Sequence, residues 1–376
     1  MIYRKMPQTG DEISILGFGC MRLPLDQEGK IDEPRATALV RSAIDRGVNY
    51  IDTAYPYHEG ESETFLGRAL ADGYREKVFL ATKLPTWKVE KRSDMDRILD
   101  EQLAKLKTNA IDYYLLHGLN SERWEAMKQK GFEDFMERAL ADGRIRRVGF
   151  SFHDKLSLFK EIVDSYNWHF CQIQYNFVDI EYQAGRAGLK YAAERNLGVV
   201  VMEPLRGGSL VRNIPPSIQA IWKESTRPLS PAGWALNWLW EQPEVSVVLS
   251  GMTTESDLED NLASAGKAAP LSDSERKMID RVRKEYLARM KVFCTGCQYC
   301  MPCPNGVNIP ECFNRYNTVY MFDELEQARF AYMNFIKPEA RASACVKCGL
   351  CEKKCPQNLE IMSHLESVAE LLEAKE

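Results

Sequence analysis

Short runs rich in β-branched and aromatic residues alternate with longer stretches along most of the chain. Eight of these runs fit β-strands: residues 13–21, 49–54, 78–83, 111–117, 147–152, 170–176, 198–204 and 245–251. Between most of them lie amphipathic segments, such as residues 33–46 and 92–106, whose apolar positions recur at helical spacing. Alternating strands and helices predict a parallel sheet, and eight such repeats predict an α/β fold of the (β/α)8 TIM-barrel type.

The chain beyond this repeat is rich in cysteine. Eight of the eleven cysteines form two runs: Cys294, Cys297, Cys300 and Cys303, then Cys345, Cys348, Cys351 and Cys355. The second run, C-x2-C-x2-C-x3-C-P, has the spacing of bacterial two-cluster ferredoxins, and the first run is one residue short of it. Helical patterns at residues 310–321 and 325–334 separate the two runs. We therefore predict a small, mainly α-helical ferredoxin-like domain that binds two [4Fe-4S] clusters.

Two other uses of these cysteines compete with the clusters. Four thiolates also make a closed zinc site, although three cysteines at this spacing plus a remote fourth is a less usual way to supply them. Disulfides need an oxidising compartment, and the N-terminus lacks the apolar segment of an export signal. If each run gives three ligands to one cluster and its fourth to the other, the expected sets are Cys294, Cys297, Cys300 with Cys355, and Cys345, Cys348, Cys351 with Cys303. The remaining Cys20, Cys171 and Cys312 are expected to be small buried hydrophobic residues.

Length and charge set the expected organisation and exclude several classes of protein. A chain of 376 residues exceeds the usual size of a single core, so we expect a barrel domain over residues 1–283 and a cluster domain over 284–376. A capping box at residues 272–275 predicts a helix near this boundary. The net charge of -5 and the pI of about 5.8 argue against a nucleic-acid partner. No apolar stretch reaches membrane-spanning length, so we expect a cytoplasmic protein with no membrane partner.

Four polar residues stand at or just after the predicted strand ends, at the rim where such barrels carry their chemistry. They are Asp52, Tyr57, Lys83 and His117. A tyrosine hydroxyl has a pKa of about 10, and a neighbouring ammonium group lowers it. An aspartate holds that lysine charged, and a histidine orients a substrate carbonyl or relays the proton. The four residues together predict a proton-donating site with Tyr57 as its acid.

These residues resemble the signature of the aldo/keto reductase family. The matching motifs are GFGCM at residues 17–21, DTAYPY at 52–57, ESE at 61–63 and LG at 66–67. The resemblance extends to Asp260 and Asn261. It implies reversible hydride transfer between NAD(H) or NADP(H) and a small-molecule carbonyl or alcohol substrate, with Tyr57 as general acid. It also implies that residues 1–11 form a hairpin closing the barrel floor.

The resemblance further implies a nucleotide site along the same rim. Ser151 and Gln172 match residues that hold the carboxamide of the nicotinamide. Gly207 and Gly208 match a loop that wraps the pyrophosphate, where glycines allow close approach of the backbone. The other positions implied to contact the cofactor are Gly19, Cys20, Met21, Asp52, Met202, Pro204, Leu205, Gly251, Met252, Asp257, Asp260 and Asn261.

The chain departs from the family at several of these positions. Phe152 stands where many members have asparagine, and Met202 stands where many have an aromatic ring. Gly251 and Asp257 occupy positions at which NADPH-selective members carry cations that pair with the 2′-phosphate. An aspartate repels that phosphate, which favours NADH or dual use unless another cation, such as Arg206, contributes.

Hydride chemistry and clusters handle electrons differently. A nicotinamide gives two electrons as a hydride and a cluster accepts one, so joining them usually needs a flavin, and the chain shows no convincing flavin fingerprint. The clusters are then expected to serve structure or redox sensing, or to meet a separate redox partner protein, a ferredoxin or a flavoprotein. The alternative function is an electron-transfer or docking protein whose barrel is mainly a binding platform.

Overall fold

The computed structural model describes residues 1–294, 296, 300–355 and 358–374, which fold into two compact units. The first unit comprises Met1–Leu205 and Leu229–Ser272, and the second comprises Arg206–Pro228 and Asp273–Glu376. The segment from Arg206 to Pro228 is thus packed with the C-terminal residues, although it lies between two strands of the barrel in the sequence. The boundary expected near residue 284 stays a prediction.

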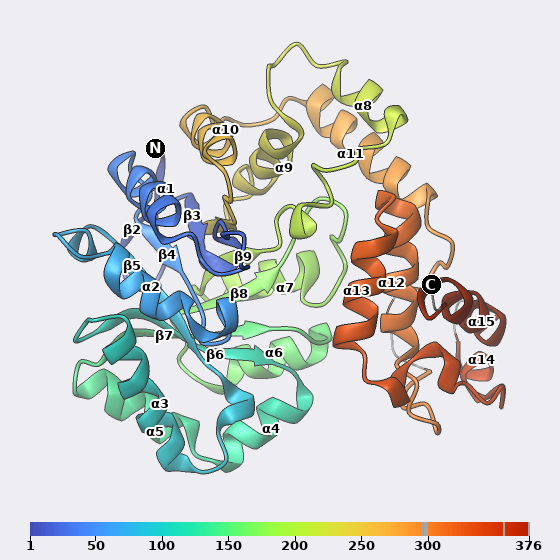
Figure 1. Ribbon diagram of the computed structural model, residues 1–376, viewed down its shortest axis with the longest axis horizontal. Helices are drawn as coiled ribbons and strands as arrows, with labels where there is room; N and C mark the ends of the chain where they lie inside the picture. The colour runs from blue at the N-terminus through green and yellow to red at the C-terminus, as the bar shows by residue number, and fades with distance from the viewer. Residues whose placement is uncertain (295, 297–299, 356–357, 375–376) are drawn as a thin grey trace. The chain divides into compact units, whose positions relative to one another are not determined.

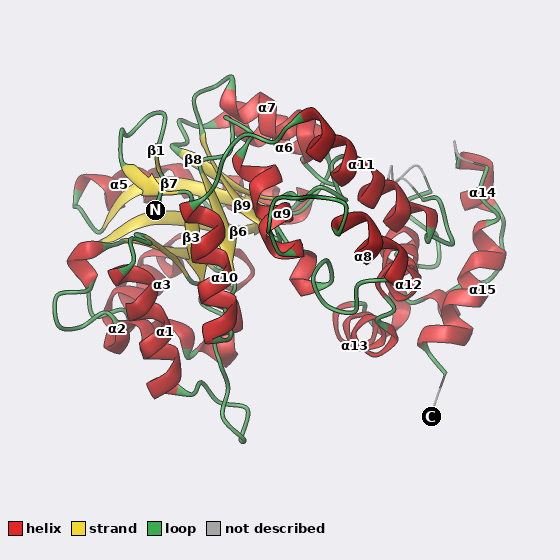
Figure 2. Ribbon diagram, turned by 90° about the horizontal axis from the view of Figure 1, so that it is seen from above, coloured by secondary structure: helices red, strands yellow, loops and turns green. Residues whose placement is uncertain are grey.

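The first unit is a closed barrel of parallel strands with helices around it, which confirms the predicted fold class (Figure 1, Figure 2). Around the barrel the strands are β10 Val247–Ser250, β3 Leu16–Gly19, β4 Tyr50–Asp52, β5 Phe79–Leu84, β6 Ile111–Leu119, β7 Ile145–Phe152, β8 Phe170–Gln174 and β9 Gly198–Met202. Its helices are α1 Glu33–Asp45, α2 Ser62–Ala69, α3 Arg92–Lys105, α4 Ser121–Gln129, α5 Phe132–Ala141, α6 Leu156–Ser165, α7 Gly185–Ala193, α9 Pro231–Trp240 and α10 Glu255–Gly266. Because every barrel strand pairs on both sides, none of the eight is an edge strand.

A hairpin precedes the barrel, as the resemblance implied. It consists of the antiparallel strands β1 Tyr3–Lys5 and β2 Glu12–Ser14. The run at residues 13–21, expected as one strand, is therefore divided between β2 and β3. The hydroxyl of Ser14 donates to the carbonyl of Leu16 at 2.7 Å across the bend that separates them. Met6 and Ile13 are buried with Tyr50 and other side chains from the strands, so the hairpin closes the barrel interior.

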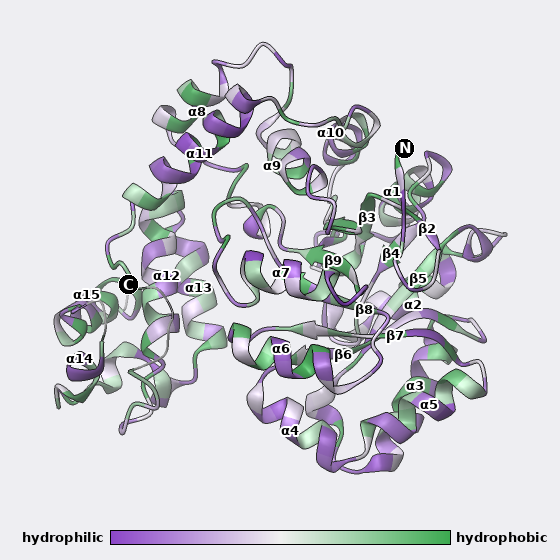
Figure 3. Cartoon of the chain, turned by 180° about the vertical axis from the view of Figure 1, so that it is seen from behind, coloured by the Kyte–Doolittle hydropathy of each residue, from purple (hydrophilic) through white to green (hydrophobic). Residues whose placement is uncertain are grey.

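Apolar side chains pack in two layers, one inside the barrel and one around it. Inside it, the ring of Tyr113 contacts Tyr50 and Phe170 edge-on, with centroids 5.3 and 5.0 Å away. A larger layer lies between the strands and the surrounding helices. Figure 3 shows β9 coloured as hydrophobic, whereas green and purple residues share helices such as α6. A strand buried on both faces is expected to be continuously apolar, and a covering helix needs only one apolar face.

The second unit is helical in its described part. Its helices are α8 Pro216–Trp222, α11 Asp273–Ala288, α12 Ile309–Phe322, α13 Leu325–Phe335, α14 Leu350–Lys354 and α15 Ile361–Leu372. Its apolar core includes Phe313, Tyr332 and Val368. No described helix of the protein combines the length and hydropathy of a membrane span. The three cysteines outside the two runs are fully buried, as predicted: Cys20, Cys171 and Cys312.

Candidate functional site

Three strand ends and one turn position the predicted catalytic residues in the first unit. Asp52 is the last residue of β4, Lys83 is the last but one of β5, and His117 lies near the end of β6. Tyr57 begins the short turn Tyr57–Gly60 that follows β4. Because β4, β5 and β6 are adjacent and parallel, their carboxyl ends point to the same rim of the barrel.

Lys83 forms a buried ion pair with Asp52. Its Nζ lies 2.7 Å from Asp52 Oδ1 and donates to the carbonyl of Thr53, also at 2.7 Å, and both paired side chains are almost fully buried. Burial by itself lowers the pKa of Lys83, but the Asp52 carboxylate, together with Tyr57 and Cys20, opposes burial, and the resulting pKa lies above its ordinary value. Lys83 is therefore a fixed positive charge at neutral pH.

The ring of Tyr57 lies beside this charge. Lys83 Nζ is 5.3 Å from the ring centroid of Tyr57, and the ring of His117 meets Tyr57 edge-on at 6.3 Å. Burial raises the pKa of Tyr57 above 10, although the Lys83 ammonium opposes this. The ammonium acts in the direction expected from the sequence, but desolvation outweighs it. Tyr57 consequently keeps its proton at neutral pH, as a general acid must.

His117 is neutral and one of its nitrogens has no partner. Burial holds its pKa well below the ordinary range, and the nearby Lys83 lowers it further. Among the described residues, no group hydrogen-bonds its buried Nδ1. The indole of Trp87 lies 5.1 Å from the imidazole, at a tilt of 53°. A neutral imidazole beside Tyr57 can bind a carbonyl oxygen without competing for the proton.

Two predicted nicotinamide contacts are neighbours across β7 and β8. Ser151 pairs in register with Gln172, and Ser151 Oγ accepts from the backbone N–H of Gly118 at 2.7 Å. Gln172 Nε2 lies 3.7 Å from the sulfur of Met202, while Gln172 Oε1 is buried without a partner in the described chain. A buried amide oxygen without a donor is costly. The donor groups of a carboxamide fit this position.

The predicted adenosine end contains groups that are already engaged. Asp257 accepts the N–H of Thr254 at 3.0 Å and caps α10, and Asp260 accepts the hydroxyl of Ser230 at 2.6 Å. Asn261 Oδ1 is buried without a described partner. A Cβ on Gly251 would lie 3.3 Å from the side chain of Arg22, a cation that sequence reasoning missed.

The predicted pyrophosphate loop falls in the second unit. Gly207 and Gly208 have φ angles of 66° and 97°, which glycine adopts at little cost. Arg206 donates to Asn314 Oδ1 at 3.1 Å, and its guanidinium lies 4.7 Å from the ring centroid of Phe322. Arg206 is therefore engaged within its own unit. The other predicted contacts occupy or follow strand ends: Gly19, Cys20 and Met21 at β3, Met202, Pro204 and Leu205 at β9, and Met252 at β10.

Sequence reasoning also missed the polar network behind Lys83. Gln102 Nε2 donates to the carbonyl of Lys83 at 3.0 Å and to Glu63 Oε1 at 2.6 Å. The hydroxyl of Tyr114 donates to Gln102 Oε1 at 2.7 Å. The available signal was Gln102 itself, a polar residue on the apolar face of α3. Its contacts fix the backbone from which Lys83 projects.

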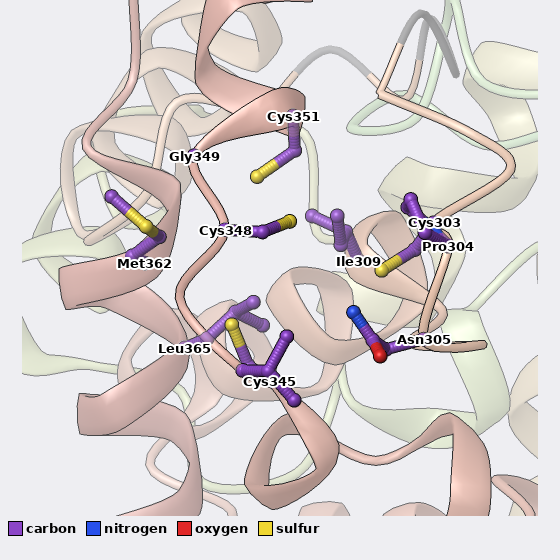
Figure 4. A pocket seen from close by; sticks show the side chains of 11 residues that line it. Cys303, Pro304, Asn305, Ile309, Cys345, Cys348, Gly349, Cys351, Met362 and Leu365 are labelled. Atoms are coloured by element: carbon purple, nitrogen blue, oxygen red, sulfur yellow. The ribbon is translucent and has the colours of Figure 1, made fainter.

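Four cysteines line one pocket in the second unit, and they are the four assigned to one cluster from the sequence. They are Cys303, Cys345, Cys348 and Cys351. Figure 4 shows the sulfur atoms of Cys348 and Cys303 directed toward each other across this space. Ile309 and Leu365 add apolar walls. Thiols spread around a pocket suit a cluster, because each thiolate then binds a different iron atom.

The second predicted set is only partly visible. Cys294 and Cys355 are partly exposed and Cys300 is buried, and all three belong to the apolar cluster of this unit. Cys297 lies outside the described residues. In the part of the chain that the structure covers, no three acidic, histidine or cysteine side chains converge as ligands of one metal ion.

Buried polar side chains fasten the segments that carry both cysteine runs. Asn317 Oδ1 accepts the N–H groups of Lys291 and Val292 at 2.9 Å each, and Asn317 Nδ2 donates to the Val292 carbonyl at 2.7 Å. On the other side, the hydroxyl of Tyr332 accepts the N–H of Ala342 at 2.7 Å. These bonds fix the backbone two or three residues before each first cysteine.

We expect Asn317→Leu to destabilise the first cysteine run. It leaves the N–H groups of Lys291 and Val292 without their acceptor and removes one of the two donors to the Val292 carbonyl, which keeps the N–H of Cys294, so the free energy of unfolding should fall by about 2–4 kcal/mol. Thermal melting followed by cluster absorbance and by helix circular dichroism would measure the loss. The matched control is Asn334→Leu, because Asn334 is exposed and, among the described residues, its side chain bonds only to the carbonyl of Phe330. Equal melting temperatures for the two variants would show that Asn317 does not stabilise the first cysteine run.

Known proteins match the chain in both of its parts. A family model described as the Aldo/keto reductase family matches residues 15–284, and one described as a 4Fe-4S dicluster domain matches residues 293–360. The aldo-keto reductase YhdN of Bacillus subtilis is 30% identical over 57% of this chain and 63% of its own length. The chain therefore spans under two thirds of that relative.

Solved structures also resemble the chain. An aldo-keto reductase from Bacillus halodurans in its holo form gives a TM-score of 0.64 at 26% identity, covering 75% of this chain and 96% of that one. An aldo-keto reductase from Klebsiella pneumoniae in complex with NADPH gives 0.61 at 25% identity, with the same two coverages.

Proposed function

Because the chain belongs to the aldo/keto reductase family and carries a 4Fe-4S dicluster domain, we propose that it transfers a hydride between NADH or NADPH and a small carbonyl or alcohol substrate. One observation carries this proposal. The ring of a protonated Tyr57 lies beside the ammonium of Lys83, which Asp52 holds charged inside the barrel rim.

Each of the four rim residues has its own role in carbonyl reduction. A bound nicotinamide supplies the hydride to the carbonyl carbon. The hydroxyl of Tyr57 gives its proton to the carbonyl oxygen, and the Lys83 ammonium stabilises the phenolate that is left. His117, being neutral, orients the same oxygen by a hydrogen bond. Asp52 keeps Lys83 charged and in place, and alcohol oxidation uses the same groups in reverse.

The cofactor contacts follow from polar atoms that lack partners. Gln172 Oε1 would accept from the carboxamide of a bound nicotinamide, and Ser151 lies beside it on the neighbouring strand. Asn261 Oδ1 is a second buried acceptor, at the adenosine end. Both fit a ligand that brings hydrogen-bond donors to buried acceptors.

The C-terminal module holds two [4Fe-4S] clusters in this proposal. Cys345, Cys348, Cys351 and Cys303 are the ligands of one, and Cys294, Cys297, Cys300 and Cys355 are those of the other. Such clusters pass single electrons, so a separate redox protein is their natural partner. Cys348 is exposed at the surface of the second unit, which supports exchange with a partner.

Nucleotide binding by Gln172→Leu tests the proposed site. We expect the dissociation constant for NADH or NADPH to rise about tenfold. The variant loses one hydrogen bond between uncharged groups, and the carboxamide of the nicotinamide is left buried without that acceptor. The measurement is cofactor fluorescence during titration of anaerobically purified protein. Gln129→Leu, an exposed change on α4, is the matched control. If the unaltered protein binds neither nucleotide, the proposed function is wrong.

A further inference from the structure

A cation from α4 folds back onto the end of β6, next to the proposed catalytic residues. Arg123 Nη1 donates to the carbonyl of Gly118 at 2.9 Å. Gly118 has a φ of 65°, and a Cβ at this position would lie 2.8 Å from Arg123 Nη1. The absence of a side chain at Gly118 therefore leaves the space in which the guanidinium lies. Gly118 directly follows His117, so this guanidinium is placed at the same rim.

Aromatic rings connect this cation with the proton donor. The guanidinium of Arg123 lies 5.0 Å from the ring centroid of Trp87, and Trp87 lies 5.1 Å from the imidazole of His117. His117 in turn faces the ring of Tyr57. Trp87 is 43% exposed, so this row of rings opens to solvent. A substrate whose carbonyl meets Tyr57 can extend along the row toward Arg123.

The charge on Arg123 is not balanced by the protein around it. In the described part of the chain, no carboxylate lies within ion-pair distance of Arg123, whereas Arg92 and Arg144 each pair with aspartates. Two histidines, His117 and His153, lie close enough to be affected by this charge. After burial, the Arg123 charge contributes to lowering the pKa of both His117 and His153. A partly buried guanidinium with free N–H donors is suited to an anion from outside.

We propose that the substrate carries one carboxylate group, which binds Arg123 while its carbonyl carbon faces the hydride donor and Tyr57. This inference rests on the proposed function and names the substrate class of that site. A single guanidinium balances a single negative charge, which favours a carboxylate over a phosphate monoester with its larger charge. The substrate class is thus the oxo-carboxylates and the corresponding hydroxy acids.

Succinic semialdehyde and butyraldehyde test this assignment, because they share a four-carbon aldehyde and differ in the carboxylate. We expect kcat/KM to be at least about tenfold higher for succinic semialdehyde, and Arg123→Gln to remove most of that preference by raising its KM. Arg123→Lys should restore part of it, since the charge is kept without the bidentate geometry. The matched control is Arg138→Gln, an exposed change on α5 that should leave the preference intact.

Three results would overturn the inference. They are equal kcat/KM for the two aldehydes in the unaltered protein, equal losses for both in Arg123→Gln, and a higher kcat/KM for an aldehyde phosphate ester than for the oxo-carboxylate. If neither aldehyde is reduced, a binding measurement tests Arg123 independently of turnover, whereas the proposed function is tested by nucleotide binding. Calorimetric titration with butyrate should then show binding that butyramide lacks and that Arg123→Gln abolishes, and no such difference would refute the anion site.

Discussion

Replacing Tyr57 by phenylalanine should lower kcat/KM for carbonyl reduction by about 10²–10⁴-fold, because the variant has no proton for the carbonyl oxygen. The ring and its edge contact with His117 are kept, so the barrel should stay folded. Cofactor oxidation with a panel of aldehydes would measure the loss. Nucleotide affinity and cluster absorbance should be unchanged, since Tyr57 contributes to neither.

The neighbouring Tyr55 supplies the control for this prediction. It lies two residues earlier, just before the turn that begins at Tyr57, and its hydroxyl donates to Glu101 Oε1 at 3.2 Å. Tyr55→Phe should reduce carbonyls nearly as well as the unaltered protein. Undiminished turnover by Tyr57→Phe would show that another group is the acid. If no carbonyl supports turnover in any variant, and a ferredoxin or flavoprotein still exchanges electrons with the protein, the barrel serves mainly as a binding platform.

Replacing Cys348 by alanine should remove one cluster. A protein with two [4Fe-4S] clusters contains about eight irons, and this change should lower iron and acid-labile sulfide to about four per chain. The cause is local, because Cys348 lines the pocket with Cys303, Cys345 and Cys351. Chemical iron and sulfide analysis of anaerobically purified protein gives the measurement, with reduction spectra recorded in parallel.

Cys312→Ser is the comparison for this loss. Cys312 lies in the same unit but is fully buried, and its sulfur contacts Tyr332 Oη and the Ala340 carbonyl away from the four-cysteine pocket. It should keep both clusters. Iron that stays unchanged in Cys348→Ala would remove Cys348 from the ligand set. Zinc in place of iron in the unaltered protein would overturn the cluster assignment altogether.

The elements were predictable because their signals are local. Apolar runs of strand length gave the eight barrel strands, and cysteine spacing separated a second helical part. One run was misjudged, since residues 13–21 hold both a hairpin strand and a barrel strand. The bend at Ser14 depends on a side-chain hydrogen bond that apolar periodicity does not register. Likewise, no local pattern predicted that residues 206–228 pack with the second unit.

The order of residues by itself determined the barrel, the helical cysteine-rich part and the four polar residues at or just after strand ends, because each depends on spacing along the chain. Tertiary structure alone decided how those groups behave. It set the 2.7 Å contact of Lys83 with Asp52, the raised pKa of Tyr57, the gathering of Cys303 with the second cysteine run, and the return of Arg123 onto Gly118. Burial and charge pairing act between residues distant in sequence, so their balance exists only after the strands have taken their register.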